Sequence, residues 1–554
     1  MSAQWMTVWT IGLCALCAAV AAQSGPPLTR AEQTRFEDTS RYADVTAFIE
    51  ALKALTPRIR VETFGMSEEG RALPLLVIGD PPAASPAQAR VSRRPVVFVM
   101  ANIHAGEVEG KEALLHLARR LTMGDLQSLL PSAIWLFAPI YNADGNERIS
   151  LDNRSEQHGP IAGVGTRENA KGLDLNRDYM KLESAEARAL ASLFSRWDPD
   201  VIVDLHTTNG SYHGYHLTYS PTLNPNADPR IIAFARERLL PAAQAAMTAR
   251  HSFRTYYYGN FTTADSLNDE LERFEPRENR PRVWRTFDQR PRFGNNYAGL
   301  RNRIAILSEA YSYLDFEGRV KATEAFVEEI MRFVASNAPE IRSLIARVDS
   351  DWIGGGSVAD AGVAFALRPL PRPVDILVGA VETQTNPRSG KPMTTMVESA
   401  ATPTRMADYG VFAATRTRRV PHEYIVPSST AVHDTIARKL KEHGIRVDVL
   451  VEPARISVEQ FVIGEVNRAE RPFQGHRETS VTGKFERRTL DLPTGSIVVR
   501  TAQPLGRLVF YLLEPESDDS LATWNLLDAA LEPGAAHPVL KVMPGQPLQT
   551  RTSP

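Results

Sequence analysis

Cysteine is almost absent from this chain, and its scarcity excludes a fold held together by disulfides. The 554 residues contain two cysteines, Cys14 and Cys17, and both lie in the apolar N-terminal segment 8–21. An exported protein without disulfides must rely on the size of its hydrophobic core. A chain of this length exceeds one ordinary core, so we expect two folded domains.

A surplus of charge of one sign is also lacking. The chain carries 63 Lys and Arg against 65 Asp and Glu, a formal net charge of −2. Nothing in this balance favours a nucleic acid or an anionic membrane surface as the main partner, so we expect no nucleic-acid partner. Internal repeats and low-complexity segments are not evident either.

The apolar run at the N-terminus is too short to span a bilayer comfortably. It covers residues 8–21 and ends in the small residues Ala19-Val20-Ala21-Ala22, which are typical of a signal-peptidase site. No Lys or Arg precedes it, which leaves an uncleaved membrane anchor as the alternative. We predict a signal peptide over 1–22, a secreted or periplasmic location, and no stable membrane insertion after cleavage.

The rest of the chain alternates short apolar runs with segments of helical spacing. Strands are expected within 61–78 and at 95–100, 133–140, 201–205 and 304–307, and helices at 41–55, 108–121, 184–194, 229–251 and 317–336. This alternation predicts an α/β fold with a mixed, largely parallel twisted sheet and helices on both faces. Ligands of such sheets bind outside the carboxyl ends of the strands.

Composition changes after the glycine run Gly354-Gly355-Gly356. Beyond residue 359 the chain is richer in Pro and β-branched residues, with one expected helix at 431–443. We therefore predict a first domain over 23–350 and a smaller β-rich accessory domain of unknown role over 359–554.

Metal-type ligands follow two of the expected strands. His104 and Glu107 are three residues apart just after the strand 95–100, and His206 follows the strand 201–205. Side chains at i and i+3 of a helical turn point the same way. Because zinc takes nitrogen and oxygen ligands, and catalytic sites use three from the protein, this pattern suggests one zinc ion between strand ends.

The order of the motifs along the chain resembles the zinc carboxypeptidase family of metallopeptidases. Residues 41–336 contain the four parts of its pattern: His104-x-x-Glu107, Asn176-Arg177, the lone His206 and Glu309. The four-part pattern is specific, although no single part is. The resemblance implies that 23–350 is the catalytic domain.

The same resemblance implies a role for each matching residue. His104, Glu107 and His206 would bind one zinc ion per chain, and Glu309 would be the general base. Asp174 matches the carboxylate that holds the first zinc histidine in its tautomer.

Asn176 and Arg177 match the pair that grips the free carboxylate of a substrate. Arg167 is the candidate for the arginine that polarises the scissile carbonyl, with Arg154 as its rival. For the tyrosine that covers the substrate, Tyr297 and the run 256–258 are both candidates.

Two departures from the family pattern concern the surroundings of the site. The family often has Arg just before the metal-binding Glu, where this chain has Gly106. The long interval between His206 and Glu309 contains Arg282, Arg285, Arg290 and Arg292. These arginines either line a specificity pocket or form a solvated face, and we favour the solvated face.

The function that follows is that of a zinc-dependent metallocarboxypeptidase acting on peptides or proteins with a free C-terminus. One alternative is a zinc-dependent deacylase or amidase acting on small amino-acid derivatives or cell-wall stem peptides. Another is a peptide-binding protein without catalysis, which the presence of Glu309 disfavours.

Overall fold

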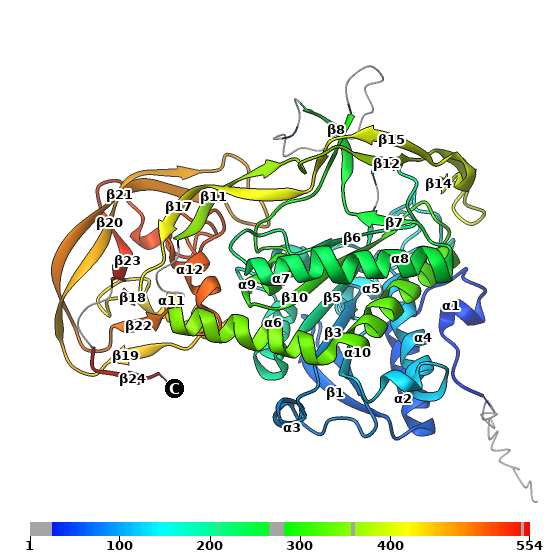
Figure 1. Cartoon of the computed structure of the whole chain (residues 1–554), viewed down its shortest axis with the longest axis horizontal. Helices are drawn as coiled ribbons and strands as arrows, with labels where there is room; N and C mark the ends of the chain where they lie inside the picture. The colour runs from blue at the N-terminus through cyan, green and yellow to red at the C-terminus, as the bar shows by residue number, and fades with distance from the viewer. Residues whose placement is uncertain are drawn as a thin grey trace, which may run out of the picture.

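The computed structural model describes residues 25–208, 210–264, 267, 282–355, 360–543 and 548–553 (Figure 1). The expected signal peptide, 1–22, lies outside these residues. The main element of the first region is a sheet whose described strands run in the order β1-β2-β4-β3-β5-β10-β6-β7. Their bounds are β1 (Ile59–Met66), β2 (Ala72–Ile78), β3 (Val96–Ala101), β4 (Ile134–Ala138), β5 (Val201–Thr208), β6 (Leu217–Pro221), β7 (Thr255–Tyr257) and β10 (Ile304–Tyr311).

The sheet is mixed, as predicted. Strands β4, β3, β5 and β10 are mutually parallel, and β7 is parallel to β6, whereas β1, β2 and β6 pair antiparallel with their inner neighbours. Strands β3, β4 and β5 are buried along their whole length, which is typical of strands covered on both faces.

Four short helices, at 30–33, 86–91, 143–147 and 294–300, were not predicted, and the helix expected at 317–336 continues to Gly355. Helices therefore occur at the five expected places and at others. They are α1 (Arg30–Gln33), α2 (Tyr42–Leu55), α3 (Pro86–Val91), α4 (Glu109–Met123), α5 (Ala143–Glu147), α6 (Ala185–Trp197), α7 (Pro229–Ala233), α8 (Leu240–His251), α9 (Gly294–Leu300) and α10 (Phe316–Gly355). The helix expected at 229–251 contains a π-helical turn, Phe234–Leu239, just before Pro241. Proline has no backbone N–H to donate, which explains the irregular turn.

The C-terminal region is β-rich, as predicted. Its described sheet has the order β21-β20-β23-β18-β22-β19-β24. The bounds are β18 (Glu423–Val426), β19 (Asp448–Leu450), β20 (Ala454–Arg468), β21 (Thr479–Leu492), β22 (Ile497–Arg500), β23 (Ala536–Val542) and β24 (Thr550–Thr552). The expected helix is α11 (His433–Glu442), but the prediction of one helix was wrong, because α12 (Gly506–Leu513) is a second.

A β-ribbon formed by residues 360–419 links the two regions and extends over the first one (Figure 1). It consists of the pairs β11 (Asp360–Arg368) with β17 (Val411–Arg419), β12 (Val374–Val378) with β15 (Thr402–Met406), and β13 (Val381–Thr385) with β14 (Pro392–Met396). Its short strand β16 (Asp408–Tyr409) pairs with β9 (Arg282–Arg285), which pairs with β8 (Asn260–Thr263).

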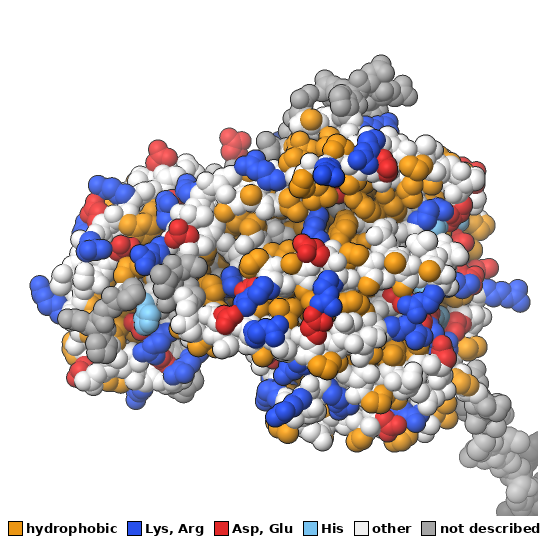
Figure 2. All heavy atoms as spheres, viewed as in Figure 1, with side chains coloured by type: hydrophobic (Ala, Val, Ile, Leu, Met, Phe, Trp, Pro, Cys, Tyr) orange, Lys and Arg blue, Asp and Glu red, His pale blue; other side chains and the backbone are white. Residues whose placement is uncertain are grey.

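One hydrophobic cluster includes buried residues of both regions, such as Val203 and Ile330 in the first and Tyr424, Leu512 and Val539 in the second. On the face shown in Figure 2, acidic and basic side chains are interspersed, in keeping with the near-zero net charge. None of the described helices combines the length and apolar character needed to cross a membrane.

Candidate active site

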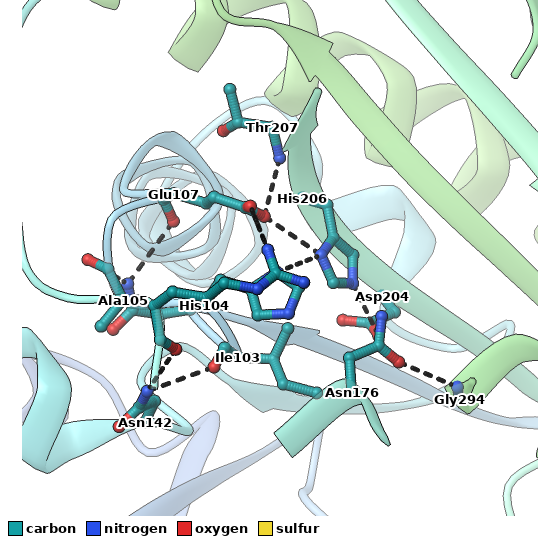
Figure 3. Close-up of polar contacts among 12 residues, drawn as sticks. Ile103, His104, Ala105, Glu107, Asn142, Asn176, Asp204, His206, Thr207 and Gly294 are labelled. Carbon is teal, nitrogen blue, oxygen red and sulfur yellow. Dashed lines mark hydrogen bonds and ion pairs between the residues drawn. The ribbon is translucent and has the colours of Figure 1, made fainter. Parts of the chain in front are cut away.

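Three buried side chains meet at one point: His104 and Glu107 from the loop after β3, and His206 from β5 (Figure 3). His104 Nδ1 lies 3.1 Å from Glu107 Oε1, and His206 Nδ1 lies 3.1 Å from Glu107 Oε2 and 3.2 Å from His104 Nδ1. The two histidines come together because β3 and β5 are adjacent and parallel. Glu107 donates its N–H to His104 O at 2.9 Å, a turn that directs both side chains the same way.

The donor atoms of this cluster fit a metal ion. One atom from each of His104, Glu107 and His206 lies within 4.8 Å of the others, and each residue is at most 3% exposed. Two Nδ1 atoms that face each other at 3.2 Å can both direct lone pairs at one cation. Two imidazoles and one carboxylate are a donor set that zinc accepts.

A second layer of carboxylates binds the opposite ring nitrogens. His104 Nε2 forms a hydrogen bond of 3.0 Å with Asp174 Oδ1. His206 Nε2 lies 2.9 Å from Asp204 Oδ2, an ion-pair contact that lacks hydrogen-bond geometry. Metal-binding histidines typically have such a partner, which fixes the tautomer. Asp174 was expected from the sequence. Asp204 was missed, although a carboxylate inside the apolar run 201–205 was a usable signal.

The charges around the cluster shift its pKa values in opposite directions. Burial raises the pKa of Glu107, but His104 and Arg154 lower it more, so it lies well below its ordinary value. Burial lowers the pKa of His206, but Asp204 and Glu107 raise it well above its ordinary value.

Glu309 lies on the strand next to His206. In the parallel pair β5–β10 the two residues are directly opposite each other. Burial raises the pKa of the Glu309 carboxyl to about 8, and Glu107 reinforces that effect against His206 and two arginines. The sequence analysis ended both strands too early, because β5 continues to Thr208 and β10 to Tyr311.

Asn176 and Arg177 occupy a tight turn that starts at Asp174. The Asp174 carboxylate accepts the Asn176 N–H at 2.9 Å. Asn176 Oδ1 accepts the Gly294 N–H at 3.0 Å, which leaves the side-chain amide nitrogen on the other side (Figure 3). The Arg177 guanidinium lies 3.9 Å from the centroid of the Phe293 ring. Among the described residues, no ion pair is formed with Arg177, and burial lowers its pKa.

The two candidate arginines contact the cluster differently. Arg154 is bound on several sides: Nη1 donates to Glu107 Oε1 at 2.9 Å, Nη2 to Thr207 O at 3.0 Å and Nε to Gln157 at 2.9 Å. Arg167 donates from Nε and Nη2 to Asp174 Oδ2, whereas its Nη1 lies 3.7 Å from Glu107. The Arg167 side chain is 39% exposed, against 19% for Arg154.

Gly106 provides the space for Arg154. A Cβ atom at Gly106 would lie 2.7 Å from Arg154 Cδ and 3.0 Å from the Gly165 carbonyl oxygen. The absence of a side chain at Gly106 therefore allows Arg154 to lie against Glu107.

Tyr297, the tyrosine predicted to cover the substrate, is buried between the first region and the C-terminal region. It is 1% exposed, and its hydroxyl lies 2.9 Å from His443 Nδ1 in the C-terminal region. Within the alternative run, the Tyr256 hydroxyl donates to Asp408 and the Tyr257 hydroxyl to Arg236 O. The helical face that carries Tyr297 packs against the C-terminal region, which the local sequence could not indicate.

The solvated-face interpretation was wrong for Arg292, whereas the Arg290 side chain is 24% exposed and does not contradict it. Arg292 is 2% exposed and pairs with Asp519 at 2.9 Å. Arg290 pairs with Asp288, which lies in the same segment.

Comparisons with known proteins agree on one family. Residues 45–270 match the family model described as zinc carboxypeptidase, a range that ends before Glu309. The chain is 23% identical over 504 residues to carboxypeptidase 2 of Trichophyton tonsurans, covering 86% of this chain and 81% of that protein. It is 32% identical over 126 residues to carboxypeptidase E of Caenorhabditis elegans, covering 22% and 25%.

Among solved structures, the chain overlaps carboxypeptidase A of Helicoverpa armigera with a TM-score of 0.39 and 16% identity, over 55% of this chain and 75% of that one. A metallo-carboxypeptidase of Burkholderia cenocepacia gives a TM-score of 0.38 and 19% identity, over 54% and 70%.

Proposed function

Because residues 45–270 belong to the zinc carboxypeptidase family, we propose that this protein is a zinc-dependent metallocarboxypeptidase that removes the C-terminal residue from peptides or proteins. The observation that carries the proposal is the buried cluster of His104, Glu107 and His206, which Asp174 links to the turn that carries Arg177, an arginine without an acidic ion-pair partner among the described residues. The sequence features of residues 8–21 add the proposal that the enzyme works outside the cytoplasm, in the medium or the periplasm.

One zinc ion per chain would be held by His104, Glu107 and His206, with Asp174 and Asp204 behind the histidines. When bound, zinc supplies a Lewis acid that polarises a carbonyl and lowers the pKa of a water molecule to about 7. The Thr207 N–H donates to Glu107 Oε2 at 3.0 Å and thereby fixes the direction of that carboxylate.

Glu309 is the proposed general base. It is the register partner of His206 on the neighbouring strand, and its carboxyl interacts electrostatically with His206 and Glu107 of the cluster. In its ionised form, which the charge of a bound zinc ion would favour, it takes a proton from the attacking water and passes a proton to the departing amine as the peptide bond breaks.

Asn176 and Arg177 are proposed to bind the free carboxylate of the substrate. A guanidinium presents two parallel N–H groups to a carboxylate, and the Asn176 amide adds a neutral donor. Phe293 supports Arg177 from one face, and desolvation by the surroundings makes an unpaired guanidinium costly unless an anion binds to it. A peptide whose C-terminus is amidated would lack that anion.

Arg167 is the better candidate to stabilise the oxyanion. The donors of Arg154 are committed to Glu107, Thr207 and Gln157. Arg167 is more exposed, and its Nη1 has only a long contact to Glu107, so this nitrogen is available to a substrate oxygen.

The test is to incubate the zinc-loaded protein with mixed peptides and to follow the products by mass spectrometry. Stepwise loss of residues from the carboxyl end is expected, and both a chelator and C-terminal amidation should block it. Cleavage at internal bonds would reject the exopeptidase assignment. Turnover of acylated amino acids in preference to peptides would favour the deacylase, and zinc-dependent binding without turnover would favour the binding protein.

A further inference from the structure

One short segment of the first region supports both members of the proposed carboxylate-binding pair. Residues 288–294 join β9 to α9, and we call them the support segment. Its Phe293 ring lies under the Arg177 guanidinium at 3.9 Å, and its Gly294 N–H binds Asn176 Oδ1 at 3.0 Å. The positions of the two side chains therefore depend on the position of this segment.

The C-terminal region holds the support segment through a buried ion pair. Asp519 accepts the Arg292 backbone N–H at 2.7 Å and the guanidinium Nε and Nη2 at 3.1 and 2.9 Å. The Arg292 guanidinium also lies 4.6 Å from the centroid of the Trp524 ring. Asp519 is fully buried and Arg292 is 2% exposed, so water cannot replace either partner without a rearrangement.

A second contact from the C-terminal region is made to Asp174, the residue at which the Asn176–Arg177 turn begins. Gln474 and Gly475 form a two-residue turn with φ values of 50° and 82°, closed by backbone bonds between Phe473 and His476. Positive φ at both positions is typical of a type I′ turn. Gln474 Oε1 accepts the Asp174 N–H at 2.9 Å, and Asp174 is the residue that binds His104 and starts the Asn176–Arg177 turn.

We propose that Asp519 and Gln474 are positioning residues of the active site, through which the C-terminal region sets the geometry of the Asn176–Arg177 pair. This inference rests on the proposed function, because it assigns to the pair the free carboxylate of a peptide. The C-terminal region then contributes to recognition of the chain end as well as to stability. Neither residue belongs to the metal-type cluster or the carboxylate-binding pair: Asp519 acts through the backbone and side chain of Arg292, and Gln474 acts through the Asp174 backbone.

The experiment compares Asp519→Asn with Arg507→Gln in the zinc-loaded full-length protein. Arg507 also joins the two regions, through Asp228 at 2.9 Å, Asn302 at 3.0 Å and the Asn226 carbonyl at 2.9 Å, and it makes no described direct contact with the support segment. Both variants lose a charged contact between the regions, and both should melt at a lower temperature. If the C-terminal region only stabilised the fold, the two variants would therefore change KM in the same way.

For Asp519→Asn, we expect KM for a peptide with a free carboxylate to rise by about 10- to 100-fold, with kcat changed much less, because carboxylate binding is shared by ground and transition states. For the same variant, the preference for the peptide with a free carboxylate over the amidated peptide should fall by the same factor. Arg507→Gln should leave KM unchanged. Equal KM values for Asp519→Asn and the wild type would overturn the proposal.

Gln474→Ala provides the same test where Asp519→Asn fails to fold, since Gln474 is only half-buried and its removal leaves no unpaired charge. A crystal structure of the folded variant gives a readout that does not need activity. We expect a displaced support segment or Asp174 turn, and contacts of Asn176 and Arg177 identical to those of the wild type would refute the inference. A wild type that does not trim peptides would instead refute the proposed function, and the crystal structure would still decide the positioning role.

Discussion

His116 makes the stability of this protein depend on pH in a direction that can be stated in advance. It lies on α4, is 7% exposed, and contacts Glu324 of α10 at 3.2 Å and Glu32 of α1 at 3.5 Å. Arg119 and Arg120 of α4 face the same carboxylates at 2.6 and 2.8 Å. Burial lowers the pKa of His116, but the hydrogen bonds and charges of the two glutamates raise it to about 9.

The raised pKa means that the charged imidazole stabilises the folded state. The difference between the ordinary value of 6.5 and about 9 corresponds to about 3 kcal/mol in the free energy of unfolding. Because the folded pKa lies above the unfolded one, this contribution is complete below pH 6.5. It is lost as the pH rises through 9.

The test measures urea unfolding of the wild type and of His116→Gln between pH 6 and pH 10, by tryptophan fluorescence. The stability advantage of the wild type should shrink by about 3 kcal/mol across this range. Both proteins keep the same metal ligands, so any effect of metal binding cancels in the difference. Glu324→Gln, which removes one partner of the imidazole, should show a smaller pH-dependent part. A difference between wild type and His116→Gln that stays constant from pH 6 to pH 10 would refute the reasoning.

Three further substitutions test the site. Glu309→Gln should keep its zinc and lower kcat by about 10²- to 10⁴-fold, and loss of the metal would instead make Glu309 a ligand. Asp204→Asn should weaken zinc binding by about 10- to 100-fold in a competition with a chelator, because Asp204 fixes the tautomer of His206. Unchanged affinity would contradict that role. Gly106→Ala should lower the stability by about 1–3 kcal/mol, because its Cβ would meet Arg154 Cδ at 2.7 Å. An unchanged melting temperature would show that Arg154 moves aside freely.

The sequence predicted the parts of the fold and site that depend on local pattern. The apolar runs gave the central strands, and the residues that follow them gave His104, Glu107 and His206, which the structure brings together. Asp174 was found in a different way, through the resemblance of the motif around Asn176-Arg177 to that of the family. The roles assigned to these residues stay predictions until they are measured.

The missed features depend on contacts between distant segments. Residues 508–513 of α12 form a short apolar run that fits a buried strand as well as a helix. Asp204 gains its role only from the direction of the His206 ring. The burial of Arg292 requires Asp519, which is 227 residues away in the sequence, and the burial of Tyr297 requires His443.

The hydrophobic cluster shared by the two regions has a consequence for how such a protein can change. Leu512 and Val539 belong to the same continuous core as Val203, which lies on β5, the strand that carries His206. A segment that is packed in this way is not an interchangeable module. Transferring it to another enzyme would expose hydrophobic surface on both the transferred segment and the protein it left. Insertions and fusions are therefore best tolerated in peripheral turns. Residues at the interface between the two regions can change only if their partners across the interface change as well.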